Sequence, residues 1–221
     1  MNKTRTLITV LFTLAAGLLR ATTATPDNII PIRVGNLVYA GDQSSVCFSD
    51  RFLETVNQET NLTVDPAFHP VKLGEDRVFD HPFCVFSGED VFQLTEQERR
   101  NLRQYLMGGG FILSSPSCSN ADWDRSLRRE LKLIFPEYKL KQIPMSDPLF
   151  STVYDITRLV EKHGKTVMLE GLEINGRIVM IYSREGLNDV ANADGCCCCG
   201  GNEIREPVKV NVNILTYALL Y

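Results

Sequence analysis

The sequence predicts an α/β domain with a mostly parallel sheet that is covered by helices on both faces. Segments with strand-like apolar runs alternate with segments whose apolar residues recur at helical spacing. The run Phe83-Cys84-Val85-Phe86 is continuously apolar, as in a central strand that is buried on both faces. Asn175-Gly176 separates two further apolar runs and predicts a β-hairpin toward the C-terminus. We therefore expect one domain over residues 30–221.

The N-terminal segment is typical of a secretory signal peptide. Lys3 and Arg5 precede an apolar run at residues 7–19, and small residues follow up to Ala24. The run is shorter than the roughly 20 residues that span a bilayer, so an uncleaved anchor is the second interpretation. We expect residues 1–24 to be removed, leaving an exported protein, periplasmic or extracellular, with no membrane span.

The charge of the chain argues against a nucleic-acid partner. The whole chain has a formal net charge of -4, and the predicted signal peptide contains basic residues but no acidic ones, so the mature protein is still more acidic. Phosphate binding needs a basic stripe. Only two short clusters approach one, at residues 99–103 and 128–129, and both fall on expected solvent faces of helices.

The first predicted elements are a strand over residues 32–40, a loop at 41–45 and a helix. Ser49 or Asp50 can cap this helix. Its apolar positions, at helical spacing, are Phe52, Leu53 and Val56.

The middle of the chain continues the alternation. A strand is expected over residues 78–86, and the spacing of Thr95 and Glu98 predicts a capping box at the start of the next helix. Gly108-Gly109-Gly110 should end that helix through a left-handed residue. The run Phe111-Ile112-Leu113 predicts the following strand.

The last third holds a helix, the hairpin and a long polar stretch. Ser119 or Asn120 can cap a helix whose apolar face repeats every four residues, at Trp123, Leu127 and Leu131. After the hairpin, residues 184–207 are too long for an ordinary loop and contain four adjacent cysteines. The tail over 211–221 fits a buried helix.

Several segments together resemble a bacterial family called domain of unknown function 4159. They are Phe86-Ser87-Gly88-Glu89, residues 94–98, Leu102 to Leu106, Gly108 to Leu113, Ser146 to Phe150, Gly176-Arg177 and Asn213 to Leu219. Where members often have His before Pro, this chain has Asp147. The resemblance implies the class I glutamine amidotransferase-like fold, a flavodoxin-like doubly wound sheet. It implies no activity, and a shared fold does not transfer one.

The run Cys196-Cys197-Cys198-Cys199 leaves three interpretations open. In an oxidising compartment the thiols can form disulfides, with Cys47 and Cys118 as more distant partners. Alternatively, soft thiolate ligands favour zinc or Cu(I), with Cys118 or Cys47 completing the metal site. The third interpretation is a redox-active or free thiol cluster. Cys84 lies in an apolar strand and is expected to be an inert core residue.

Open α/β sheets bind ligands at the carboxyl ends of their strands, which gives the candidate ligand site. The candidate residues are Gly88, Glu89, Cys118, Asn188 and Asp189. The sequence favours a non-catalytic domain that binds an unknown small molecule or an envelope protein. The alternative is a periplasmic hydrolase or thiol oxidoreductase that uses Cys118 or the cysteine run. That alternative needs a base, and His69, His81 and His163 are interpreted as loop or helix-end residues without a recognisable triad partner.

Overall fold

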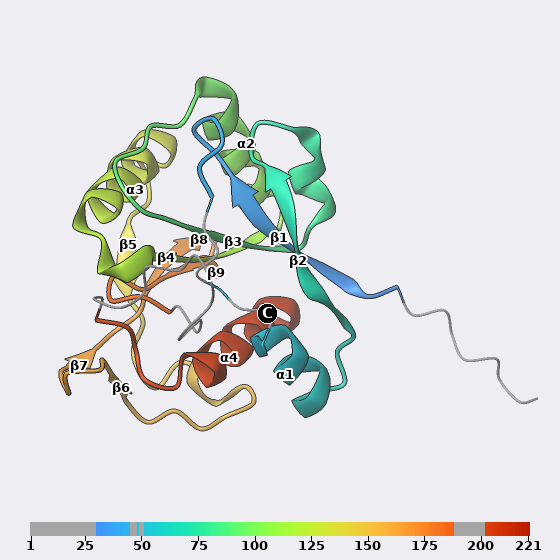
Figure 1. Cartoon of the computed structure of the whole chain (residues 1–221), viewed down its shortest axis with the longest axis vertical. Helices are drawn as coiled ribbons and strands as arrows, with labels where there is room; N and C mark the ends of the chain where they lie inside the picture. The colour runs from blue at the N-terminus through green and yellow to red at the C-terminus, as the bar shows by residue number, and fades with distance from the viewer. Residues whose placement is uncertain (1–29, 45–47, 49–50, 188–201) are drawn as a thin grey trace, which may run out of the picture.

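The computed structural model describes residues 30–44, 48, 51–187 and 202–221, and in this part the chain forms a seven-stranded sheet between two layers of helices (Figure 1). The strand order is β2-β1-β3-β4-β9-β8-β5. The seven strands are β1 (Ile32–Val38), β2 (Val64–Lys72), β3 (Phe83–Gly88), β4 (Phe111–Pro116), β5 (Leu140–Gln142), β8 (Glu170–Ile174) and β9 (Arg177–Tyr182). A separate pair is formed by β6 (Leu159–Val160) and β7 (Thr166–Val167).

The sheet is mostly parallel, as predicted. The strands β2, β1, β3, β4 and β9 run in the same direction, whereas β8 is antiparallel to both of its neighbours, β9 and β5. Every residue of β3 and β4 is buried, which explains why both segments lack the alternation of a half-exposed strand.

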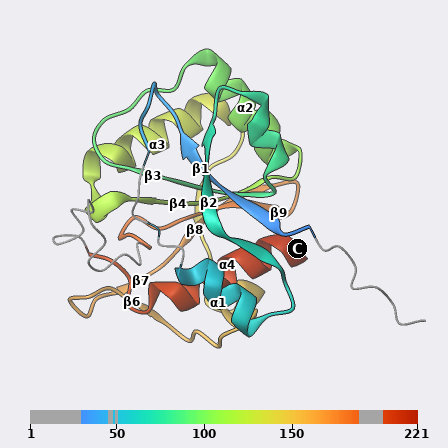
Figure 2. The ribbon, with the colours of Figure 1, turned by 45° about the vertical axis from the view of Figure 1, so that its right-hand side comes forward.

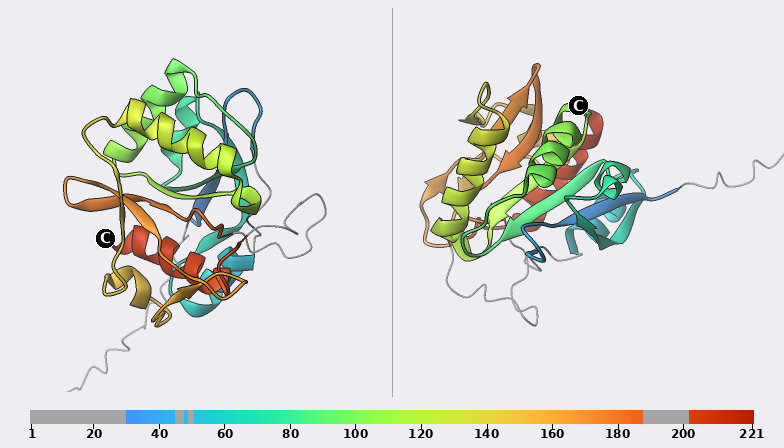
Figure 3. Two further views of the ribbon diagram at one scale, coloured as in Figure 1. Left: turned by 90° about the vertical axis from the view of Figure 1, so that its left-hand side faces the viewer. Right: turned by 90° about the horizontal axis from the view of Figure 1, so that it is seen from above.

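Two helices cover each face of the sheet. Helices α1 (Arg51–Glu59) and α4 (Pro207–Leu220) pack on one face, while α2 (Glu96–Met107) and α3 (Ala121–Ile134) pack on the other. Figures 2 and 3 show α3 and α4 on opposite sides of the strands. Each face has its own apolar core, so the central strands separate two cores rather than border one.

The local helix signals are confirmed. The Thr95 hydroxyl accepts a hydrogen bond from the Glu98 N–H, and the Glu98 carboxylate accepts one from the Thr95 N–H. Asn120 caps α3 by accepting from two backbone N–H groups. At the end of α2, Gly109 has a φ of 104°, the left-handed conformation predicted for the glycine triplet.

Several strands and boundaries differ from the prediction: β6 and β7 were not expected, and α4 begins at Pro207, inside the stretch expected to be a loop. The strand β2 contains Pro66 and Pro70, which hide its pattern; an edge strand tolerates them because one side donates no ladder hydrogen bonds. The three-residue β5 is too short to leave a pattern. The strand expected over residues 78–86 begins only at Phe83, because a 3₁₀ turn, η1 (Asp76–Asp80), takes up its first part.

The Asn175-Gly176 turn joins β8 and β9 as antiparallel neighbours. The chain then continues into α4, so this pair lies inside the domain and is not its C-terminal element. The guanidinium of Arg177 donates to the carbonyls of Gly109, Ala218 and Tyr221, which ties the turn to both the α2–β4 connection and the end of α4. In the part of the chain described, no helix has the length and apolar character needed to cross a membrane.

Replacing Thr95 by Ala removes the side-chain acceptor of the capping box. We expect Thr95→Ala to lower the free energy of unfolding by about 1 kcal/mol in urea titrations. Thr55→Ala is the control, because the exposed Thr55 hydroxyl only bonds back to the Arg51 carbonyl within α1. An equal loss in both variants would show that the cap contributes nothing specific.

Candidate ligand site at the carboxyl edge of the sheet

The carboxyl ends of β1, β3, β4 and β9 meet at one edge of the sheet because these strands are parallel neighbours. Ser87 and Ser115 are register partners near the ends of β3 and β4. Ser183 directly follows β9 and donates its N–H to the Ser114 carbonyl at 3.0 Å. The edge therefore carries three serines from three adjoining strands.

Asn211 joins these serines from the first turns of α4. By strand alternation, Ser87, Ser115 and Ser183 face the α1 and α4 side of the sheet. The Ser115 hydroxyl accepts from the Leu187 N–H at 3.3 Å, and the Asn211 amide donates to the Leu187 carbonyl at 3.0 Å. All four side chains are completely buried. We call Ser87, Ser115, Ser183 and Asn211 the buried polar cluster.

Three oxygens of this cluster lack a hydrogen-bond partner among the described residues. They are Ser87 Oγ, Ser183 Oγ and Asn211 Oδ1. By contrast, both polar atoms of the nearby Asn213 side chain are hydrogen-bonded. Its Oδ1 accepts from the Val153 and Tyr154 N–H groups, and its Nδ2 donates to the Tyr154 carbonyl. A buried polar group without a partner costs about 1–3 kcal/mol, so three at one place are unusual for a purely structural region.

Backbone strain gathers at the same edge. Non-glycine residues with positive φ follow three of the four strands: Ala40 after β1, Asp90 after β3, and Cys118 with Ser119 after β4. Cys118 has φ 51° and ψ 31° and is half-buried. The Ser119 hydroxyl holds this turn by donating to the Glu185 carbonyl at 2.6 Å and accepting from the Asn202 N–H at 2.7 Å. Such left-handed residues cluster at functional sites in proteins.

Gly88 has a packing role at this edge. A Cβ on Gly88 would lie 2.0 Å from the Tyr39 hydroxyl and 2.8 Å from Trp123 Nε1. Those two groups form a buried hydrogen bond of 2.7 Å, and the Tyr39 hydroxyl also donates to the Ser87 carbonyl. Burial raises the pKa of Tyr39, so its hydroxyl stays protonated as this donor. Glycine at position 88 thus allows β1, β3 and α3 to meet.

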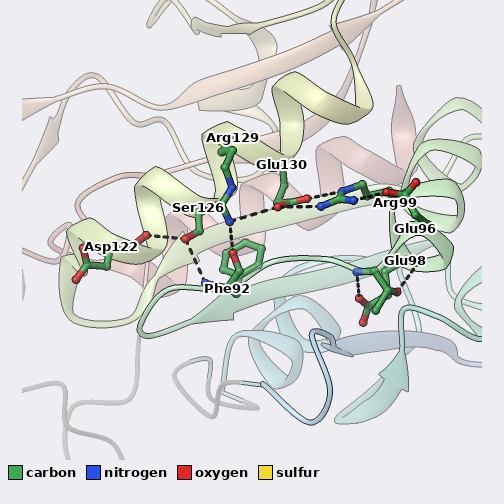
Figure 4. Close-up of polar contacts among 9 residues, drawn as sticks. Phe92, Glu96, Glu98, Arg99, Asp122, Ser126, Arg129 and Glu130 are labelled. Atoms are coloured by element: carbon green, nitrogen blue, oxygen red, sulfur yellow. Dashed lines mark hydrogen bonds and ion pairs between the residues drawn. The ribbon is translucent and has the colours of Figure 1, made fainter.

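The loop that carries Glu89 and Asp90 is fastened to α3 (Figure 4). The Phe92 N–H donates to the Ser126 hydroxyl at 3.2 Å, and Arg129 donates to the Phe92 carbonyl. Arg129 also contacts the buried Glu130 carboxylate, whose other partner is Arg99 Nε at 2.8 Å. A buried carboxylate between two guanidiniums fixes the position of the loop relative to α2 and α3.

The structure places part of the sequence-predicted site together. Gly88, Glu89 and Cys118 lie at the carboxyl edge, whereas Asn188, Asp189 and Cys196 to Cys199 lie outside the described residues. Among the described residues, no group of three His, Cys, Asp or Glu side chains could hold a metal ion. Cys84 is completely buried, and burial raises the pKa of its thiol to about 12, which suits the core role expected for it.

The sequence did not single out the buried polar cluster. Its one local signal is Ser114-Ser115 at the end of an apolar strand, with Asn211 inside an otherwise apolar helical segment. The histidines lie in other parts of the fold. His81 is at the amino end of β3, His69 is near it on β2, and His163 is exposed in the β6–β7 turn.

Comparison with known proteins gives one finding. The model of the family Domain of unknown function (DUF4159) matches residues 34–219, a stretch that contains the whole buried polar cluster. No curated protein matches the chain.

Gly88→Ala tests the packing at the end of β3. The added methyl group must displace the Tyr39 hydroxyl, so we expect a loss of about 1–3 kcal/mol in the free energy of unfolding. Gly74→Ala is the control, because its nearest heavy atom would be Glu98 Cγ at 3.7 Å. Equal stability of both variants in chemical denaturation would contradict the packing described here.

Glu130→Gln tests the anchor of the β3–α2 loop. The change removes the buried charged partner of Arg99, which keeps its ion pair with the exposed Glu96, and we expect it to cost about 1–3 kcal/mol of stability. Glu137→Gln is matched to it, because Glu137 pairs with Arg103 at the surface; solvent screens this pair, so it should contribute little to stability. Thermal and urea unfolding of both variants would reveal the difference, and a loss at Glu130 no greater than at Glu137 would count against the anchor.

Proposed function

The chain belongs to the family Domain of unknown function (DUF4159), and from this premise we propose that it is an exported, non-catalytic domain that binds a small polar molecule at the carboxyl edge of its sheet. The observation that carries the proposal is the buried polar cluster with its three oxygens that lack a partner among the described residues. A ligand that bonds to these atoms would offset their desolvation cost.

We also propose that the domain has a flavodoxin-like fold and belongs to the glutamine amidotransferase-like superfamily. The strand order supports the first part. Numbered among themselves along the chain, the five parallel strands are arranged 2-1-3-4-5, which is the flavodoxin order. In that fold the ligand lies outside the carboxyl ends of the strands, near the point between β1 and β3 where the order reverses.

The cluster also suggests the chemistry of the ligand. Asn211 Oδ1 can only accept, while the Ser87 and Ser183 hydroxyls can donate or accept. The partner must therefore carry at least one N–H or O–H group together with an acceptor oxygen or nitrogen. A small polar metabolite fits this requirement, whereas an apolar ligand would leave the three oxygens unpaired.

Binding is favoured over catalysis by the positions of the histidines. A thiol nucleophile at Cys118 would need a base within hydrogen-bond reach. The imidazole of His81 is engaged with the Arg33 carbonyl at 3.2 Å, at the amino end of β3, and His69 pairs with Asp65 at 2.9 Å on β2. His163 lies in the exposed β6–β7 turn.

The described residues on either side of the cysteine-rich stretch lie at the same edge. Residues 188–201 begin after Leu187 and end before Asn202, and these flanking residues bond to Ser115 and Ser119 respectively. The chain therefore enters and leaves the cysteine-rich stretch beside Cys118. Disulfide bonds and a soft metal, zinc or copper, are the two proposals for Cys196 to Cys199, and thiol counting with metal analysis distinguishes them.

The unpartnered serines make a prediction about stability. Because the Ser87 and Ser183 hydroxyls form no hydrogen bond within the described part of the chain, we expect Ser87→Ala and Ser183→Ala to leave the free energy of unfolding unchanged or to raise it. Ser114→Ala is the matched control, because its buried hydroxyl donates to the Phe86 carbonyl at 2.9 Å; its loss should cost about 1 kcal/mol. If Ser87→Ala and Ser183→Ala lower the free energy of unfolding as much as Ser114→Ala does, the two hydroxyls already have hydrogen-bond partners.

The same variants test ligand binding. A thermal-shift screen against amino acids, amides, small carboxylic acids and sugars should find a compound that stabilises the wild-type protein. At 100 times its Kd such a ligand contributes about 2.7 kcal/mol. We expect Ser87→Ala/Ser183→Ala to lose this stabilisation while Ser114→Ala retains it. A compound that stabilises all three proteins equally binds elsewhere and would contradict the proposed site.

A further inference from the structure

A second polar concavity lies on the opposite face of the sheet, at its β2 edge. It is a pocket of about 430 Å³ between β1, β2 and η1, and its charged or titratable lining residues are Arg33, His69, Lys72, Glu75, Arg77, Asp80 and His81. None of these residues belongs to the buried polar cluster, which lies at the ends of β3, β4 and β9. The pocket is therefore a separate feature, and its chemistry is independent of the function proposed for the carboxyl edge.

Two imidazoles form part of the lining. Their ring centroids are 6.0 Å apart. His81 is only 3% exposed, and its Nδ1 lies 3.2 Å from the Arg33 carbonyl. Since a carbonyl can only accept, Nδ1 carries the proton and Nε2 is the acceptor of the neutral ring. Gly35 makes room for this ring, because a Cβ there would lie 3.4 Å from His81 Cγ and 2.6 Å from Cys84 Sγ.

Among the described residues, none of the cations around the imidazoles forms a salt bridge, although Arg33 lies close enough to Asp65 to interact electrostatically with it. Arg33, Lys72 and Arg77 are exposed, and within the described part of the chain none of their side chains forms an ion pair or a hydrogen bond. Three cations and two acidic residues, Glu75 and Asp80, line the pocket, and Asp65 beside it is paired with His69. Cations that converge on one concavity without a salt bridge favour an anionic ligand.

We propose that this pocket binds a small phosphorylated molecule, with its phosphate group held by Arg33, Arg77 and His81 and with His69 at its side. Guanidinium groups match the geometry of phosphate oxygens and form charge-assisted hydrogen bonds with them. The pocket volume is within the range of roughly 300–1,000 Å³ that is typical of small-molecule sites. A bare phosphate ion would fill only part of this volume, so the ligand carries an organic portion as well.

His81 makes the binding depend on pH. Burial lowers the pKa of His81, so its ring is neutral in the free protein near neutral pH. The charged groups that face it are Arg33 from β1, His69 and Lys72 from β2, Glu75 from the following turn, and Arg77 and Asp80 from η1. A bound dianion favours the protonated ring, and by linkage the affinity for a dianion rises as the pH is lowered.

The experiment uses the three histidines of the chain as reporters. Glycerol 3-phosphate is added to the full protein while the imidazole C–H signals are followed by NMR, with sulfate as a second probe whose charge is constant over the pH range used. We expect glycerol 3-phosphate to shift the His69 and His81 signals but not that of the exposed His163. We expect Arg33→Gln/Arg77→Gln to weaken binding by at least about tenfold. Sulfate should bind more tightly at about pH 5.5 than at about pH 7.5.

Arg125→Gln is the control variant, because Arg125 is an exposed arginine of α3 paired with Asp122. It should bind glycerol 3-phosphate as the wild type does. Three outcomes would overturn the proposal: no shift at His69 and His81, equal weakening by Arg125→Gln and Arg33→Gln/Arg77→Gln, or sulfate affinity that does not change with pH. Sulfate that binds as tightly as glycerol 3-phosphate would also overturn it, because the site would then hold an adventitious anion only.

Discussion

Burial of the central strands on both faces is the constraint on which the rest of this structure depends. Strands β3 and β4 contact an apolar core on each side, so their side chains are apolar until the last residues of each strand. In these two strands polar side chains occur only in the last residues. Because the five central strands are parallel, those ends fall along one edge, and the buried polar cluster, the strained turns and Cys118 all lie there. The place of the candidate site is thus a consequence of the sheet itself.

Hydrogen bonds and ion pairs connect this edge to the neighbouring strands and helices. The Tyr39–Trp123 hydrogen bond lies next to Gly88 and joins the end of β1 to α3. Glu130, with Arg99 and Arg129, connects the loop after β3 to α2 and α3. These contacts lie on the α2 and α3 side, whereas the unpartnered oxygens face α1 and α4. One face of the edge therefore holds the supporting contacts, and the other holds the buried polar cluster. Sites that combine a fixed scaffold with unsatisfied polar groups are suited to binding small polar molecules.

The sequence predicted what depends on local chemistry. The capping box of Thr95 and Glu98, the cap at Asn120 and the left-handed glycine after α2 are all encoded within a few residues, and all three are present. The strand ends at Gly88 and Cys118 could be located because each follows an apolar run. The buried polar cluster could not, since it arises when strand register and a helix bring together four residues that are distant in the sequence. The need for glycine at position 88 likewise comes from Tyr39 and Trp123, far away along the chain.

The pocket of His69 and His81, like the buried polar cluster, could not be predicted from local sequence. The pocket of His69 and His81 depends on side chains from β1, β2 and η1, and β2 was hidden by its prolines. The most direct test of the central claim is a crystal structure of the protein purified from its native host, with attention to Ser87 Oγ, Ser183 Oγ and Asn211 Oδ1. We expect a bound polar molecule within hydrogen-bond distance of these three atoms. If all three are instead satisfied by groups of the protein or by water, the carboxyl edge is not the ligand site.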